Sequence, residues 1–165
     1  MGDVKMIIAK MLKAEGRYRE ALKILEDKKD SYEKLSLNDK LKYNYDIAWL
    51  YWKTNNKLMY KYIEKNKELF SLKDNRKNYK ISYAKFLSLY SDIYKDRITK
   101  ADYQKAFLKV YSLYSGISEY YSSLAIVKVL ESKGNKENLN KYVNYVLNNS
   151  NDNILKERIK QEKVI

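Results

Sequence analysis

The 165-residue chain contains no proline and only four glycines. Average usage at this length would supply roughly eight prolines and about a dozen glycines. Proline interrupts helices and glycine marks turns, so their scarcity favours long helices joined by short polar connections. Apolar residues also recur at helical spacing, as at Ile8 and Leu12 and at Leu22 and Leu25. The sequence therefore predicts an all-α fold.

Seven short clusters of Gly, Asn, Asp or Ser separate the periodic segments and indicate turns. The helices are expected near residues 3–15, 18–34, 38–54, 57–71, 75–95, 100–114, 118–133 and 136–149, with a charged tail helix near 152–162. A chain of this size buries roughly 70% of its unfolded surface, enough for an independent core. We therefore expect residues 1–165 to form one domain.

Three helix starts carry a side-chain acceptor three residues before a carboxylate, which is a capping pattern. The three are Ser36-x-x-Asp39, Ser71-x-x-Asp74 and Thr99-x-x-Asp102. In each, the carboxylate would lie in the first helical turn, where the helix dipole favours a negative charge. The pattern predicts a helix N-terminus at each of these positions.

Cysteine and histidine are both absent from the sequence. Their absence excludes disulfides, thiolate nucleophiles, imidazole bases and nearly all zinc or haem ligation. The sequence also holds no glycine-rich phosphate loop, calcium loop or nucleophile elbow. We expect no catalytic residue, no metal site and no cofactor, and therefore a protein that is not an enzyme.

No apolar run approaches the roughly 20 residues of a membrane span, and the start of the chain lacks a signal-peptide pattern. A cytoplasmic location without membrane contact is expected. The formal net charge is +13. This charge fits an anionic partner, but the 29 Lys against 5 Arg also fit the codon usage of an AT-rich genome.

The segment 14–22 resembles the turn between the two helices of a tetratricopeptide repeat. In that turn Gly closes the first helix, Tyr packs into the turn and Ala admits the second helix, which are the roles of Gly16, Tyr18 and Ala21. Further copies lie at 100–107, with Ala101 in the Gly position, at 133–139, which matches the first half, and at 54–57, where Asn55 replaces Gly.

These turns are 39, 46 and 33 residues apart, whereas the family keeps close to 34, so the resemblance is to a degenerate repeat. It implies a right-handed stack of about four antiparallel helix pairs, a tetratricopeptide-like α-solenoid. Because Met1 lies close to the expected start of a first repeat helix, a fragment of a longer protein also fits.

The family draws its inner, ligand-binding wall from the first helix of each pair. Carried over to this chain, the inner positions are Lys10, Lys13, Lys42, Tyr45, Trp49, Trp52 and Lys53. Aromatic anchors bordered by cations suit a protein or peptide partner with apolar and acidic side chains. The alternative is that Trp49 and Trp52 pack as core between the second and third helices.

A second basic feature follows in the chain. Lys57, Lys61 and Lys65 share one helical face, and Arg76 and Lys77 come after them. Such a surface suits RNA or single-stranded DNA, because lysines contact the phosphates and aromatic rings stack on the bases. A solvated lysine face is the alternative, because nucleic-acid readout favours arginine.

The leading hypothesis is a non-catalytic helical repeat module that binds a protein or peptide, with an acidic one favoured by the charge. A basic protein bound to RNA or single-stranded DNA is the alternative. The resemblance also admits the peptide-sensing domain of a bacterial regulator, although no helix-turn-helix motif accompanies it. Association into a homo-oligomer stays open, since the sequence gives no oligomeric state.

Overall fold

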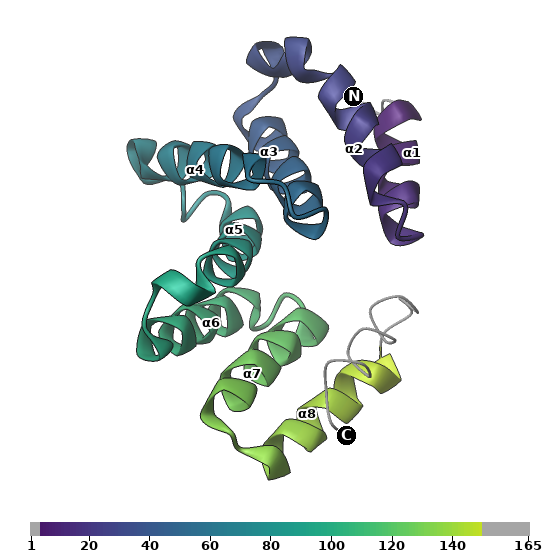
Figure 1. Ribbon diagram of the computed structural model, residues 1–165. Coiled ribbons are helices and arrows are strands. Elements are labelled where there is room, and N and C mark those ends of the chain that lie inside the picture. Colours follow the sequence, from purple (N-terminus) through teal and green to yellow (C-terminus); the bar gives the residue numbers. More distant parts are fainter. Residues whose placement is uncertain (1–3, 150–165) are drawn as a thin grey trace. The chain divides into compact units, whose positions relative to one another are not determined.

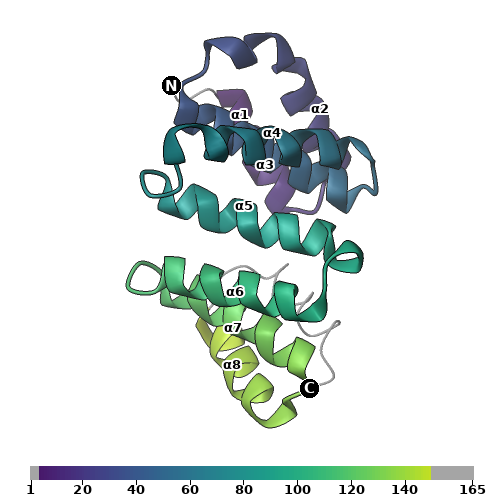
Figure 2. The same cartoon turned by 90° about the vertical axis from the view of Figure 1, so that its left-hand side faces the viewer.

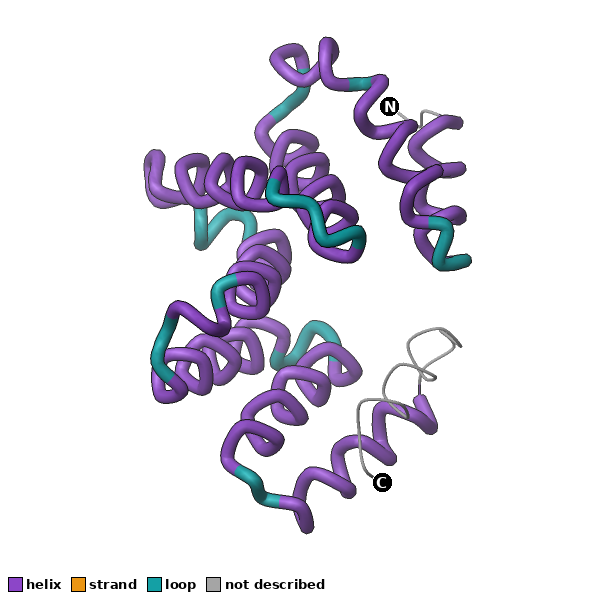
Figure 3. The backbone as a smooth tube through the Cα atoms, in the orientation of Figure 1, coloured by secondary structure: helices purple, strands orange, loops and turns teal. Residues whose placement is uncertain are grey.

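The computed structural model describes residues 4–149, which form helices and connecting turns without any strand (Figure 1 and Figure 3). The prediction of an all-α fold is confirmed for this part of the chain. The expected tail helix near 152–162 lies outside the described residues. The chain divides into two compact units, Met1–Leu89 and Tyr90–Ile165. A single repeat domain and a right-handed solenoid stay predictions.

Unit 1 contains α1 (Val4–Ala14), α2 (Tyr18–Asp27), the 3-10 helix η1 (Lys29–Lys34), α3 (Leu37–Lys53), α4 (Leu58–Ser71), the 3-10 helix η2 (Leu72–Asp74) and the first part of α5 (Lys80–Ile93). Consecutive helices pack against one another from α1 to α4. The fully buried side chains of Leu25, Leu41, Ile47 and Ile63 fill the space between α2, α3 and α4. Phe70 links α4 to α5 through ring contacts with Tyr83 and Phe86.

Unit 2 contains the end of α5, the 3-10 helix η3 (Lys95–Arg97), α6 (Lys100–Tyr114), α7 (Glu119–Lys133) and α8 (Lys136–Asn149). Helix α7 packs against both α6 and α8, which Figure 2 shows in its lower part. Val127, Val143 and Val146 form the buried cluster between α7 and α8. The buried centre of the contact between α7 and α8 therefore consists of branched aliphatic side chains.

Three connections use the same left-handed turn. Gly16, Asn55 and Gly134 have φ angles of 80°, 56° and 70°. In each turn the amide of the following residue bonds back to a carbonyl five residues earlier, as Arg17 does to Leu12 at 2.8 Å. This is the Schellman geometry, in which a left-handed residue satisfies the last carbonyls of a helix. The expectation that Asn55 replaces glycine is confirmed, whereas Ala101 is helical, inside α6, and not part of a turn.

Two of the three predicted caps are confirmed. The hydroxyls of Ser36 and Thr99 accept hydrogen bonds from the backbone N–H of Asp39 and Asp102, at 3.2 and 3.0 Å. The cap predicted at Ser71 is wrong. Its hydroxyl donates instead to the carbonyl of Glu68 at 2.7 Å, within α4, of which Ser71 is the last residue.

The expectation of a helix starting near residue 75 is also wrong, because α5 begins at Lys80. The side chain of Asn75 donates to the carbonyls of Leu69 and Leu72, at 3.0 and 2.6 Å. Asn75 therefore ends α4 rather than starting α5. Lys73 and Asp74 take positive φ angles of 56° and 50° to make the turn.

The single helix expected over 18–34 is wrong in its second half. Helix α2 ends at Asp27 and the chain continues as the tighter helix η1. Asp and Ser side chains compete for local backbone bonds, which makes this stretch a weak α-helix former. The Tyr32 ring packs 5.7 Å from that of Tyr43, and its hydroxyl accepts a hydrogen bond from Asn44 at 2.9 Å. Contacts with α3 thus accompany the change of helix type.

A buried polar pair fixes α3 against α4. The Asn44 side chain donates to Asn66 Oδ1 at 2.9 Å, and the Asn66 side chain donates to the carbonyl of Leu41 at 2.9 Å. Both asparagines are buried. Because a buried amide needs its partners, this pairing specifies how the two helices align. Elsewhere on α3, Asp46 pairs with Lys13 of α1, and the ring centroid of Tyr45 lies 5.8 Å from Lys85 Nζ of α5.

Candidate ligand-binding groove

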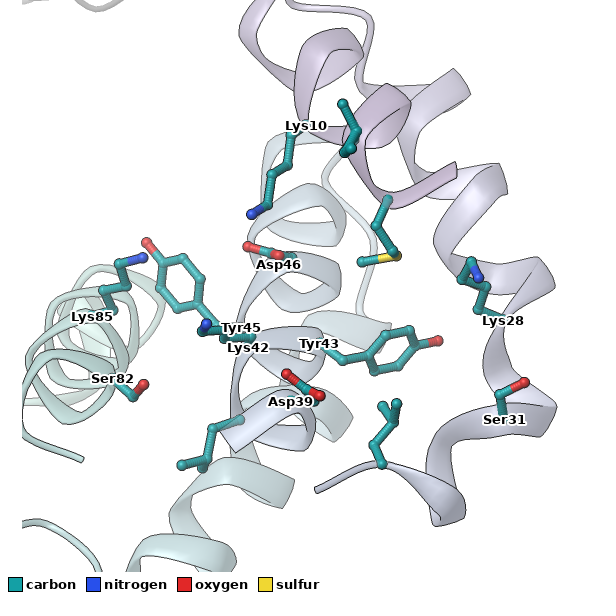
Figure 4. Close-up of a pocket in the computed structure, with 14 residues that line it drawn as sticks. Lys10, Lys28, Ser31, Asp39, Lys42, Tyr43, Tyr45, Asp46, Ser82 and Lys85 are labelled. Carbon is teal, nitrogen blue, oxygen red and sulfur yellow. The ribbon is translucent and has the colours of Figure 1, made fainter. Parts of the chain in front are cut away.

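Unit 1 contains a groove of about 610 Å³ bounded by α1, the end of α2 with η1, α3 and the first part of α5 (Figure 4). Four lysines line it, namely Lys10, Lys28, Lys42 and Lys85. Asp39 and Asp46 are the acidic side chains in its lining. Four lysines against two aspartates leave a formal net charge of +2, so the groove favours an anionic ligand.

The apolar part of the groove comes from α1, from the turn before α3 and from α3 itself. Met6 and Ile7 of α1 line it together with Leu35 and Leu41. The Tyr43 ring adds an aromatic surface, and its buried hydroxyl donates to the carbonyl of Leu25 at 2.8 Å. Ligand pockets combine apolar lining with a few oriented polar groups, and this groove has both.

Asp46 lies among the lysines of the groove wall, as Figure 4 shows for Lys10 and Lys42. Its carboxylate forms an ion pair with Lys13 at 3.9 Å. Burial raises the pKa of the Asp46 carboxyl, while Lys13, Lys85, Lys10 and Lys42 act in the opposite direction. Asp46 is thus an acidic side chain within a wall of lysines, where it pairs with Lys13.

Three aromatic side chains of α3, those of Tyr45, Trp49 and Trp52, lie beneath lysines. Lys13 Nζ is 4.3 Å from the ring centroid of Trp49, and Lys53 Nζ is 4.2 Å from that of Trp52. Tyr45 has Lys13 at 5.6 Å. All three rings are half-buried. Cation–π contacts of this kind hold the charge over the ring face and keep it near the surface.

Three of the seven residues predicted for the inner face line the groove, namely Lys10, Lys42 and Tyr45. The other four form a cluster that continues along α3 beyond it: Lys13, Trp49, Trp52 and Lys53. Trp49 also packs edge-on against Tyr18 of α2, with ring centroids 5.2 Å apart. The two tryptophans are therefore neither fully core nor fully exposed.

Sequence reasoning missed Asp46 and Lys85. Asp46 follows Tyr45 directly on α3, but the inner positions of the family pattern do not include it. Lys85 lies on α5, and its Nζ is 5.8 Å from the ring centroid of Tyr45. No local signal in the sequence connects these two residues, because only folding brings α5 beside α3.

The lysine face of α4 has a different structure. Lys65 Nζ lies 4.7 Å from the ring centroid of Tyr32 and 5.1 Å from that of Tyr62, and Lys61 also lies over Tyr62 at 5.5 Å. Tyr62 is buried, and burial lowers the pKa of Lys65. The exposed residues Lys57 and Lys77 are spread around this helix and the turn after it.

Arg76, also predicted for the anion-binding face, donates to Asp74 Oδ1 at 3.1 Å. The charge of its guanidinium is therefore shared with a carboxylate of the same turn. Between residues 4 and 149 no cluster of three acidic, His or Cys side chains has the geometry of a metal site. None of the helices in this range is long and apolar enough to cross a membrane.

Comparison of the chain with models of protein families, with curated proteins and with solved structures found no match. The groove and the aromatic face of α3 are therefore interpreted from their own geometry.

Proposed function

We propose that the chain is a non-catalytic module that binds an acidic segment of another protein in the groove of unit 1. The observation that carries the proposal is a groove lined by Lys10, Lys42 and Lys85 together with Tyr45, whose ring centroid lies 5.8 Å from Lys85 Nζ. A carboxylate side chain entering there would contact lysines from three separate helices. Charge complementarity of this kind steers association and sets the register of a ligand.

The cluster beyond the groove supports the same proposal. Trp49 and Trp52 keep part of their rings accessible and carry Lys13 and Lys53 over their faces. Large aromatic side chains with little conformational entropy to lose are the usual anchors of protein interfaces. A partner segment longer than the groove would continue onto these rings.

A tetratricopeptide-like repeat remains part of the proposal. The matching left-handed turns at Gly16, Asn55 and Gly134 support it, because repeats of one supersecondary unit reuse one turn geometry. Ala21 is fully buried beside the first of these turns, as the family pattern expects. In such repeats the first helices of successive pairs line a binding surface, which here are α1, α3 and α5.

An acidic protein segment is favoured over nucleic acid by the surroundings of the aromatic rings. Stacking of bases requires accessible ring faces. On α4 the rings of Tyr62 and Phe70 are buried, and lysines cover the outer side of Tyr62. On α3 the rings of Tyr45, Trp49 and Trp52 are half-buried, whereas α4 has one half-buried ring, that of Tyr60, and the α3 rings adjoin a groove that also offers apolar side chains.

The test is the binding of a fluorescein-labelled peptide rich in glutamate and leucine, measured by fluorescence polarisation. The double variant Lys42→Glu/Lys85→Glu reverses two charges of the groove. The matched control Lys57→Glu/Lys61→Glu makes the same change in net charge on α4. We expect the groove variant to lose about 10- to 100-fold in affinity and the control less than about 3-fold.

Equal losses in the two variants would mean that binding follows net charge alone, and the proposal would be wrong. The same titration with a single-stranded oligonucleotide tests the alternative function, which is nucleic-acid binding. Tighter binding of the oligonucleotide, abolished by the α4 variant and by about 0.3 M salt, would favour the nucleic-acid function instead.

A further inference from the structure

Helix α1 exposes an apolar stripe on the side that does not face the core. Val4, Ile7, Ile8 and Met11 are 68%, 53%, 43% and 58% exposed. They occupy positions i, i+3, i+4 and i+7, which is one face of a helix. Of the ten large apolar side chains exposed among residues 4–149, four lie on this helix. Scattered exposed apolar residues are ordinary, but a contiguous set marks an interaction surface.

This stripe adjoins the groove. Ile7 belongs to both, since it is exposed on α1 and also lines the groove beside Met6 and Lys10. On the other side of the groove stand Lys42 of α3 and Lys85 of α5. An apolar ridge and a cationic wall therefore run side by side.

Resting on the proposed function above, we propose that this combined surface binds an acidic amphipathic helix of a partner protein. The apolar stripe of that helix would pack on Ile7 and Met11 of α1. Its flanking carboxylates would reach Lys10, Lys42 and Lys85. Helix-in-groove recognition works through apolar anchors at the i, i+3, i+4 and i+7 positions of the ligand.

The spacing of the stripe favours a helical ligand over an extended one. Val4 and Met11 are seven positions apart on α1, which corresponds to a rise of about 10 Å along the helix axis. Ridges of this kind pack into the grooves between side chains of a second helix.

Charge argues against a second copy of this chain as the occupant, and the shape of the groove argues against a lipid surface. A second copy of this chain would bring Lys5, Lys10 and Lys13 of its own α1 to the interface, and like charges would then face one another. A lipid surface would contact the exposed ridge, but Lys42 and Lys85 line a recess that a flat membrane interface does not enter. An acidic helix satisfies both the ridge and the recess.

Two fluorescein-labelled peptides with the same composition of Glu, Leu, Ala and Gln test the inference. One places its leucines at helical spacing, and the other places them at alternate positions. We expect the helical peptide to bind at least about 10-fold more tightly and to gain helicity by circular dichroism when bound. The double variant Ile7→Ser/Met11→Ser should weaken it by about 10-fold, because two apolar contacts are lost.

The matched control is Leu108→Ser/Tyr111→Ser, which removes two exposed apolar side chains of α6 in unit 2. We expect no change in affinity for that variant. All four substituted residues are exposed, so both variants should keep the far-ultraviolet spectrum of the native protein.

Equal binding of the two peptides, both dependent on Lys42 and Lys85, would overturn the helical inference and leave the proposed function standing. If neither peptide binds, both the helical inference and the proposed function are overturned. If Ile7→Ser/Met11→Ser leaves the helical peptide's affinity unchanged, the inference is also overturned. Ultracentrifugation and co-sedimentation with phosphatidylserine vesicles would then show whether the ridge serves a second copy or a lipid surface.

Discussion

Helices α3 and α4 of unit 1 both carry aromatic rings interleaved with lysines, but the rings differ in their surroundings. Trp49 and Trp52 on α3 are half-buried next to a groove, and the lysines above them come from α1 and from α3 itself. Tyr62 and Phe70 on α4 are buried in the core of the unit. On α3 the half-buried rings with lysines over them adjoin the groove, whereas on α4 Lys61 and Lys65 lie over the buried ring of Tyr62.

The largest effect expected from this difference is on stability. Tyr62 contacts the rings of Tyr43 and Tyr51, so truncation in Tyr62→Ala should lower the free energy of unfolding by about 3–5 kcal/mol. The half-buried Trp52→Ala should cost only about 1–2 kcal/mol. Urea unfolding followed by circular dichroism measures both. Similar losses for the two variants would make Trp52 a core residue and remove the contrast.

A somewhat smaller loss is expected from the polar pair that aligns the two helices. Asn66→Ala leaves the carbonyl of Leu41 and one donor of Asn44 without their buried partner. We expect unfolding free energy to fall by about 2–3 kcal/mol. Glu64→Ala on the exposed side of α4 is the control and should change it by less than about 0.5 kcal/mol. A neutral result for Asn66→Ala would mean that packing alone aligns α3 with α4.

Alkaline pH should weaken unit 1 through the rings that α3 and α4 bury. Burial raises the pKa of Tyr51 to about 12 and also raises the pKa values of Tyr43 and Tyr62. Unfolded tyrosine titrates near pH 10. Since the folded state keeps protons that the unfolded state loses, stability is retained below about pH 10 and declines as pH rises toward 12.

Urea midpoints measured between about pH 9 and pH 11.5 test this expectation. The variant Tyr51→Phe removes one of the titrating hydroxyls and should show a shallower decline than the native chain. A midpoint that stays constant across this range would indicate that the phenol groups ionise without unfolding and are more accessible than their burial implies.

The smallest expected effect concerns ligand affinity and the acidic side chains of the two helices. Asp46→Asn removes a negative charge from the groove wall and should tighten the binding of an acidic peptide by about 3-fold. Glu68→Gln makes the same change on the exposed side of α4 and should have no measurable effect. Equal tightening by both substitutions would place the peptide under general charge attraction, without a preference for the groove.

Much of the helix pattern was predictable because it depends on local chemistry. The helices expected over 100–114 and 136–149 have the observed bounds, and that over 38–54 differs by one residue at each end. Capping hydroxyls and left-handed residues act within one turn, so a short stretch of sequence specifies them. Predictions failed at 28–34 and at 71–79. In the first segment Tyr32 accepts a hydrogen bond from Asn44 of α3, and in the second the side chain of Asn75 donates to the carbonyl of Leu69.

The candidate site was predictable only in part. Lys10, Lys42 and Tyr45, which the resemblance assigns to an inner wall, line the groove. The resemblance gave no reason to choose Asp46, which shares that lining, or Lys85 from α5. The sequence also left the face of Lys57, Lys61 and Lys65 as an alternative site, because residue types alone do not show which aromatic rings are buried.

The sequence by itself determined the helical class, most helix ends and the left-handed turns at Gly16, Asn55 and Gly134, because these depend on proline content, periodicity and capping within a few residues. Tertiary structure alone decided which aromatic rings are buried and which lysines share a groove. Those properties depend on the approach of α1, α3 and α5, which are far apart in the chain. Charge and burial act through distance in space, and only the packed helices set that distance.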